Sequence, residues 1–262
     1  MNSTIISVDI RSYPGIKEDF TGTIFRGWLG ASLHCREHGS CIKKCPNQVS
    51  CPYNMVFKEK IDVKPFSLLS FKAGSLIRGF IKVHGDKQDF VPEIVSRIHD
   101  HSNAVHFNGQ HYSVEELTVR KVETPDFKWG ERIRIHSISP LYLEKDKRME
   151  ILPEFGSILS ASIRAYNRVC KYYARDLYPY RTEIDLKNLY APILDYDIKT
   201  VQVNHKSMDG RKIALKGISG TILYDTSDVS PEAADILHLG SYMQIGKHST
   251  YGFGGFMVKC EV

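Results

Sequence analysis

The sequence GKHSTYGFGGF occupies residues 246–256, close to the C-terminal end of the chain. It combines four glycines with two basic side chains, two hydroxyl side chains and a tyrosine. Glycines let backbone N–H groups approach a phosphate closely, and a neighbouring lysine adds positive charge. A glycine-rich turn that leads into an edge strand is the alternative, because short glycine motifs often occur by chance. The elements that precede this segment decide between the two readings.

The second half of the chain predicts the element order βαββαβ. Alternation of apolar and polar residues indicates strands, and apolar residues three and four apart indicate helices. Ser230 as N-cap and Pro231 at the first helical position predict where the last helix begins. The predicted elements are a strand over 132–138, a helix that starts near Pro153, strands over 201–204 and 213–224, a helix that follows the N-cap Ser230, and a strand over 256–260.

The first half predicts the same order. Its elements are a strand over 3–10, a helix over 18–34, strands over 66–71 and 76–83, a helix over 89–101 and a strand over 112–122. In the last strand the alternation slips between Val114 and Leu117. We therefore predict the α+β class, with two ferredoxin-like (βαββαβ) domains in tandem over residues 1–127 and 128–262 and a C-terminal glycine-rich loop over 246–255.

Composition agrees with a globular protein. The chain has 262 residues, 42% hydrophobic and 25% charged, and a formal net charge of +5. This charge is compatible with a polyanionic partner without requiring one. No apolar run approaches the ~20 residues needed to span a bilayer, and the N-terminus lacks a basic region typical of a signal peptide. We expect a cytoplasmic protein with no membrane partner.

Four of the six cysteines fall within an insertion over residues 35–51. In a reducing compartment such a cluster favours a metal site over disulfides. Four thiolates close a tetrahedral zinc site that stabilises a loop without a core of its own, and they leave no open position for catalysis. We predict a structural zinc ion, with an iron–sulfur cluster or free cysteines as alternatives. The predicted ligands are Cys35, Cys41, Cys45 and Cys51.

The whole chain resembles the repeat-associated (RAMP) superfamily of CRISPR-associated proteins. Within it, the chain is most similar to the Cas-six type, the endoribonuclease that cuts precursor CRISPR RNA within its repeats. The resemblance rests on the tandem element order, the segment 246–254, the sequence FRGWLG at 25–30, the cysteine cluster with its Cys51-Pro52-Tyr53 exit, and Leu152-Pro153 before Gly156-Ser157-Ile158. The cysteines resemble those of one branch of the family. The first half departs from the family pattern, because Gly109 is the only glycine over 104–111.

The resemblance implies cleavage without a cofactor. The 2′-hydroxyl attacks the adjacent phosphorus and leaves a 2′,3′-cyclic phosphate and a free 5′-hydroxyl, so the enzyme needs a proton acceptor, a proton donor and positive charge. In the family the active-site histidine usually lies on or just after the first helix. We predict His34, His38 and Lys43 as catalytic residues, with His205 and His248 as alternatives. A partly buried helix-end histidine without a catalytic role is the simpler interpretation of His34.

The glycine-rich loop is expected to bind the RNA backbone through N–H groups around Gly252 and Gly254 and through Lys247. Tyr251 would stack on a base or pack against Phe253. Arg164 and Arg168 are one turn apart in the helix that starts near Pro153. This spacing suggests that the two side chains clamp a phosphate, although a solvated helix face is the commoner explanation. The complete predicted RNA-binding set is Arg164, Arg168, Lys247, His248, Ser249, Tyr251, Gly252 and Gly254.

Two other functions compete with an endoribonuclease. One is a RAMP subunit that binds guide RNA in an effector complex without cutting it, and the other is a metal-stabilised interaction domain with no RNA role. The expected partners are CRISPR repeat RNA and other Cas subunits, and the sequence leaves a homodimer open.

Overall fold

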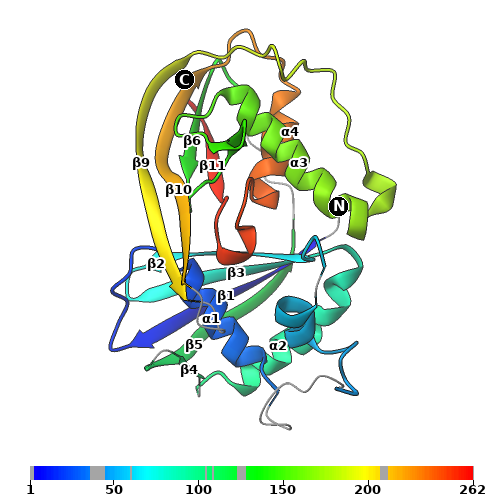
Figure 1. The fold of residues 1–262 in the computed structure, drawn as a ribbon, viewed down its shortest axis with the longest axis vertical. Helices are drawn as coiled ribbons and strands as arrows, with labels where there is room; N and C mark the ends of the chain where they lie inside the picture. The colour runs from blue at the N-terminus through cyan, green and yellow to red at the C-terminus, as the bar shows by residue number, and fades with distance from the viewer. Residues whose placement is uncertain are drawn as a thin grey trace. The chain divides into compact units, whose positions relative to one another are not determined.

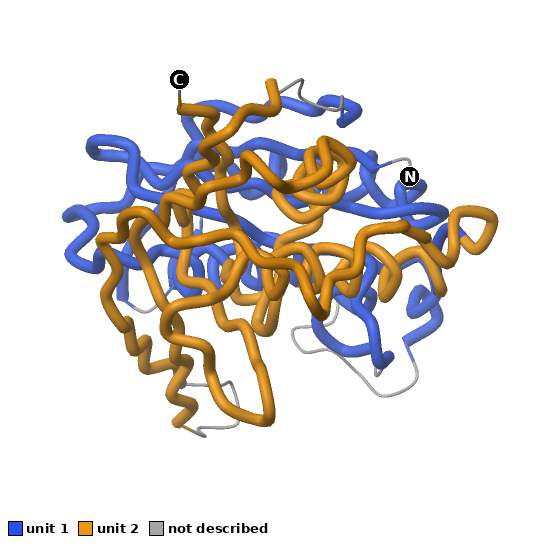
Figure 2. The backbone as a smooth tube through the Cα atoms, turned by 90° about the horizontal axis from the view of Figure 1, so that it is seen from above, with its two compact units in different colours: residues 1–122, 172–174 blue, residues 123–171, 175–262 orange. Residues whose placement is uncertain are grey.

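A computed structural model describes residues 3–35, 45–59, 61–103, 105–107, 109–122, 128–206 and 212–261. The chain divides into two compact units (Figure 2). Unit 1 comprises Met1–Val122 with Tyr172–Ala174, and unit 2 comprises Glu123–Lys171 with Arg175–Val262. The predicted boundary after residue 127 adjoins residues 123–127, which lie outside the described ranges.

Unit 1 is an antiparallel sheet with two α-helices on one face (Figure 1). Its strand order, β2-β3-β1-β5-β4, is the ferredoxin-like order with one short edge strand added. The elements are β1 (Ser3–Tyr13), α1 (Gly22–Leu33), β2 (Phe66–Ala73), β3 (Leu76–His84), α2 (Val91–Asp100), β4 (Val105–Phe107) and β5 (Gln110–Lys121). Both predicted helices and all four predicted strands of this half are present, and β4 is the strand that the sequence pattern missed.

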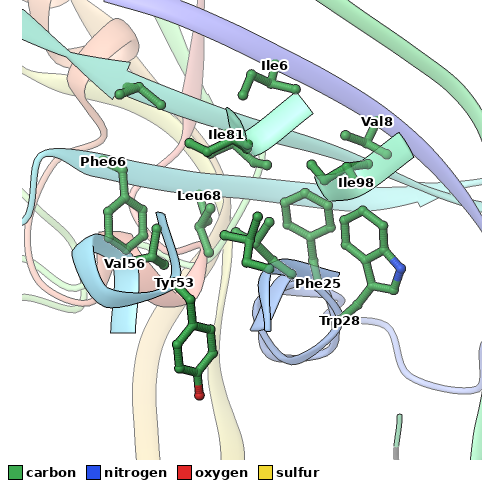
Figure 3. Close-up of a cluster of buried hydrophobic side chains, with 14 of the residues drawn as sticks. Ile6, Val8, Phe25, Trp28, Tyr53, Val56, Phe66, Leu68, Ile81 and Ile98 are labelled. Atoms are coloured by element: carbon green, nitrogen blue, oxygen red, sulfur yellow. The ribbon is translucent and has the colours of Figure 1, made fainter. Parts of the chain in front are cut away.

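Phe25 and Trp28 of α1 fill the core of unit 1 together with Ile6 and Val8 of β1 (Figure 3). All four side chains are fully buried, and each such burial contributes about 1.5–3 kcal/mol. Gly79 of β3 permits this packing, because a Cβ atom there would lie 2.1 Å from the ring of Phe25. The position of α1, and with it the residues that follow the helix, is thus fixed by close packing on the sheet.

The slip in alternation on β5 is a β-bulge. Asp9 pairs with Glu116 whereas Ile10 pairs with Val114, so Glu115 has no partner on β1. One extra residue in a strand moves every later side chain to the other face. Val114 and Leu117 therefore both face the core, against which both are packed.

Unit 2 has the same topology, with strand order β11-β6-β10-β9 in an antiparallel sheet. Ile133 and Ile135 of β6 are buried, and Arg132 and His136 on the alternate positions are exposed, as the pattern predicted. The elements are β6 (Arg132–Ser137), β7 (Glu144–Lys145), β8 (Arg148–Met149), α3 (Phe155–Tyr173), β9 (Ile193–Lys206), β10 (Lys212–Asp225), α4 (Ala233–Met243) and β11 (Phe256–Glu261). The α+β class with tandem ferredoxin-like units is confirmed.

Among the boundaries that were wrong are the starts of α1, β9 and α4. The α1 helix begins at Gly22 rather than at residue 18. The β9 strand starts at Ile193 rather than 201, because pairing with β10 extends it through residues without clear alternation. Ser230 is not the N-cap: α4 begins at Ala233, and Ser230 Oγ instead accepts from the N–H of Glu232 (3.3 Å) in the preceding turn. None of the helices in the described ranges is both long and apolar enough to cross a membrane.

Candidate active site and nucleic-acid interface

His34 lies directly after α1, where the chain leaves the helix with an extended backbone (φ −68°, ψ 131°). The side chain is half-buried, and its ring meets the edge of Tyr53 at a centroid distance of 5.2 Å. His34 lines a pocket of about 730 Å³ in unit 1. The remaining lining residues are Cys35, Cys45, Asn47, Ser50, Cys51, Asp89, Phe90, Glu93, Ser96, Arg97, Asp100 and His101.

Arg97 of α2 faces the same pocket, and sequence reasoning did not select it. Its Nη1 donates to the carbonyl oxygen of Leu33 (2.9 Å) and lies 3.8 Å from the sulfur of Cys51. Its Nε donates to Glu93 Oε1 (2.8 Å), one turn earlier on α2. A half-buried guanidinium thus links α2 to the end of α1. No sequence signal marks this link, because 64 residues separate Arg97 from Leu33.

Three of the four predicted metal ligands, Cys35, Cys45 and Cys51, line this one pocket. The fourth, Cys41, lies outside the described residues, as do the predicted catalytic residues His38 and Lys43. Within the described ranges no group of three His, Cys, Asp or Glu side chains is arranged to hold a metal ion. The described cysteines therefore do not form a metal site by themselves, and zinc stays a prediction.

The glycine-rich loop joins α4 to β11, and it uses its own N–H groups in the fold. Gly254 N–H donates to the carbonyl of Pro140 (2.9 Å), and Gly252 N–H donates to the carbonyl of Ser249 (3.2 Å). These two donors are thus already used within the fold, and an RNA contact of the loop through the N–H groups around them stays a prediction. A loop must satisfy its buried polar groups internally, and these two glycine donors serve that purpose.

Gly246 and Gly254 are needed for geometry. Both have positive φ (79° and 90°), a conformation that favours glycine. A Cβ atom on Gly246 would lie 2.1 Å from the carbonyl oxygen of Tyr142, and one on Gly254 would lie 2.3 Å from that of Ile245. Gly246 thus lets the loop lie close to the chain after β6, and Gly254 lets the two ends of the loop lie against each other.

Lys247, His248 and Tyr251 project into a cluster that includes residues the sequence did not select. Lys247 Nζ is 2.6 Å from Glu144 Oε2 and 5.2 Å from the centre of the Tyr142 ring. The ring of His248 meets Tyr142 edge-on at 5.7 Å. Burial, together with the charge of Lys247, lowers the pKa of His248. At neutral pH His248 is therefore a neutral aromatic group.

Tyr251 also contacts a residue at the far end of another strand. Its ring meets that of His205, which lies near the end of β9, at 5.2 Å. The structure thus brings both alternative histidines, His205 and His248, to the sides of Tyr251. Ser249 is half-buried and is the first residue of a 3₁₀ turn that ends at Tyr251.

The other basic groups differ in how far they are neutralised. Arg164 and Arg168 are exposed on α3 and have no ion-pair partner among the described residues. Arg134 of β6 contacts Glu261 and lies 3.6 Å from Asp195. Arg134 is consequently a weaker anion site than Arg164 and Arg168.

The fold and the loop together define a protein with tandem ferredoxin-like units and a glycine-rich connection before the last strand. Residues 135–256 match the family described as CRISPR-associated endoribonuclease Cas6. This match, over nearly half of the chain, confirms the predicted resemblance to the Cas6 type. The cysteine-containing branch stays a prediction. No curated protein is similar in sequence to the chain.

Solved Cas6 structures have the same fold. A Cas6 product complex has a TM-score of 0.61 and 14% identity, covering 100% of both chains. A Cas6 from Thermus thermophilus has a TM-score of 0.62 and 14% identity, covering 98% of both. A partial Cas6-RT-Cas1–Cas2 complex has a TM-score of 0.61 and 12% identity, covering 98% of this chain and 46% of that one. At these identities the similarity establishes the fold alone.

Proposed function

We propose that the chain is an endoribonuclease that cleaves precursor CRISPR RNA within its repeats by metal-independent attack of the 2′-hydroxyl, leaving 2′,3′-cyclic phosphate and 5′-hydroxyl ends. One observation carries the proposal: His34 lines an open pocket at the end of α1, in a chain whose second unit matches the Cas6 family. Similar structures that are described as product and substrate-mimic complexes support an RNA substrate.

In the proposed reaction the 2′ oxygen forms a bond to phosphorus as the bond from phosphorus to the 5′ oxygen breaks. His34 accepts the 2′ proton, because histidine is the side chain that most often acts as a general base in enzymes. A second group donates a proton to the leaving 5′ oxygen, and His38 or Lys43 is proposed for it. The guanidinium of Arg97 supplies positive charge to the same pocket.

We propose that the RNA backbone contacts Lys247, Arg164 and Arg168, and that a base stacks on Tyr251. These cations are on unit 2, and phosphate contacts dominate the affinity of such proteins for RNA. Other Cas subunits are proposed partners, in view of the Cas6-RT-Cas1–Cas2 complexes among the similar structures. A homodimer and a structural zinc ion are retained as proposals, and no step of the reaction uses the metal.

The test compares His34→Ala with His101→Ala, a histidine from the same pocket whose Nδ1 lies 2.8 Å from the Arg97 carbonyl oxygen. In single-turnover cleavage of repeat RNA, His34→Ala is expected to be about 10²–10⁴-fold slower with unchanged RNA affinity, and His101→Ala to cleave like the wild type. Wild-type rates in His34→Ala would show that another residue carries the chemistry. Tight binding without cleavage by the wild type would favour a non-catalytic RNA-binding subunit.

A further inference from the structure

Three aromatic side chains form one row across three neighbouring strands of unit 1. Tyr13 ends β1 and is the register partner of His111 on β5, which is in turn the register partner of His106 on β4. The Tyr13 and His111 ring centroids are 5.8 Å apart, and those of His111 and His106 are 5.0 Å apart. Strands β1, β5 and β4 lie next to one another at this edge of the sheet (Figure 1).

This row faces away from the helices. Its chain neighbours Tyr112 and Val105 belong to the buried core, and successive side chains of a strand point to opposite faces. Tyr13 is 49% exposed, His106 is exposed and His111 is half-buried. Core packing therefore does not account for three rings at this level of the sheet.

The exposed rings suit a partner that carries rings of its own, and a cation beside them suits a partner that is also anionic. Arg11, the preceding outward-facing residue of β1, pairs with Glu115 through Nε and Oε1 at 3.0 Å, and both side chains are about one-third exposed (35% and 36%). Arg11 Nη2 also donates to Glu115 Oε2 (3.4 Å), and a phosphate can replace the carboxylate on the same two donors because the pair is partly exposed to water. A metal ion is a poorer fit, because the described residues offer no third ligand of the usual types here.

We propose that Tyr13, His111 and His106 form a stacking platform for unpaired nucleotides of single-stranded RNA, with Arg11 on the adjoining phosphate. Aromatic side chains bind successive bases by stacking, and a flanking cation follows the backbone. The inference builds on the proposed function in one respect, namely that the chain binds RNA. It assigns an RNA-binding surface to unit 1, where the sequence predicted catalytic residues but no member of the RNA-binding set.

The experiment measures binding of a fluorescently labelled short poly(A) oligoribonucleotide by anisotropy. His106→Ala and Tyr13→Ala are expected to weaken binding about 10-fold each, and His106→Phe, which keeps a ring, is expected to stay within about 2-fold of wild type. Val119→Ala is the matched control, because Val119 is 47% exposed on the opposite face of the same strand β5. Unchanged thermal unfolding of each variant verifies that unit 1 is folded.

Repeat cleavage by the same variants separates this inference from the proposed function. If the wild type leaves the repeat intact while His106→Ala loses poly(A) binding, the proposed reaction fails and the platform stands. If the wild type cleaves and both alanine variants bind poly(A) as it does, the platform is wrong and the reaction stands. The platform is also wrong if the alanine variants change the oligomeric state and leave RNA binding unaltered, because the row is then a protein interface.

Discussion

The guanidinium of Arg97 on α2 donates a 2.9 Å hydrogen bond to the carbonyl oxygen of Leu33, the last residue of α1. That carbonyl has no partner within the helix, since the last turn of an α-helix leaves its C=O groups unpaired. His34 is the next residue, so this bond fixes the backbone from which the proposed catalytic ring projects. Arg97 therefore connects the stability of unit 1 with the geometry of its pocket.

We predict that Arg97→Gln costs about 1–3 kcal/mol in the free energy of unfolding and slows repeat cleavage more than it weakens RNA binding, because the Leu33 carbonyl loses a charged donor. Urea denaturation and single-turnover kinetics measure the two effects. Glu93→Gln is the matched control: it removes the ion pair on the surface of α2 but leaves the bond to Leu33, and it should cost about 0.5 kcal/mol or less. Equal effects of the two changes would contradict the role given to the Leu33 bond.

Alanine substitution should cost much more stability at Gly254, in the glycine-rich loop, than at Gly74, in the turn between β2 and β3. Gly254→Ala places a Cβ atom 2.3 Å from a backbone oxygen at a φ of +90° and should destabilise unit 2 by more than about 2 kcal/mol. Gly74→Ala also has a positive φ (+61°), but nothing lies within 4 Å, so we expect about 1 kcal/mol. Thermal unfolding of both variants is the measurement. Equal losses of stability would mean that the backbone conformation alone, and not the nearby oxygen, requires glycine at position 254.

Lys247 is expected to contact phosphate by exchanging its partner Glu144. Lys247→Ala should change stability by less than about 1 kcal/mol and reduce the slope of log K against log salt for RNA binding by about 1. Lys145→Ala is the control, because Lys145 and Lys247 have the same side-chain exposure (51%) and each pairs with a glutamate. An identical salt slope in both variants would mean that Lys247 does not bind the RNA.

His248 should make unit 2 sensitive to acid. Burial lowers its pKa below the ordinary value of 6.5, so below that pH the unfolded chain binds more protons than the folded chain. Stability must therefore fall as the pH falls through about 6.5. In His248→Asn, a residue that tolerates the left-handed backbone here (φ 68°), the loss of melting temperature between neutral and mildly acidic pH should be smaller. An unchanged loss would show that other groups are responsible.

Periodicity in the sequence was sufficient to predict the order of the main elements. Ile133 and Ile135 alternate with charged residues because one face of β6 is buried, and such alternation indicates a strand from the sequence alone. Even the slip between Val114 and Leu117 was a real feature, the bulge at Glu115. Strand β9 was underestimated because its length follows from pairing with β10, which no local pattern encodes.

Fewer residues of the candidate site than of the fold could be predicted from the sequence. His34 could be selected from its place at the end of a helix, and Lys247 from its place beside glycines. Arg97, Glu144 and Tyr142 could not be selected, because each reaches its partner through the tertiary fold across 64 residues or more. The N–H groups of Gly252 and Gly254 were assigned to RNA because a sequence does not reveal which donors the fold itself uses.

The most direct test of the central claim is to incubate the purified chain with its repeat RNA in excess EDTA and to analyse the ends of the products. Metal-independent attack by the 2′-hydroxyl predicts cleavage at one position in the repeat, with a 2′,3′-cyclic phosphate on the upstream product and a 5′-hydroxyl on the downstream product. Intact RNA in EDTA that is cleaved once a divalent cation is restored, or products with a 5′-phosphate, would contradict it.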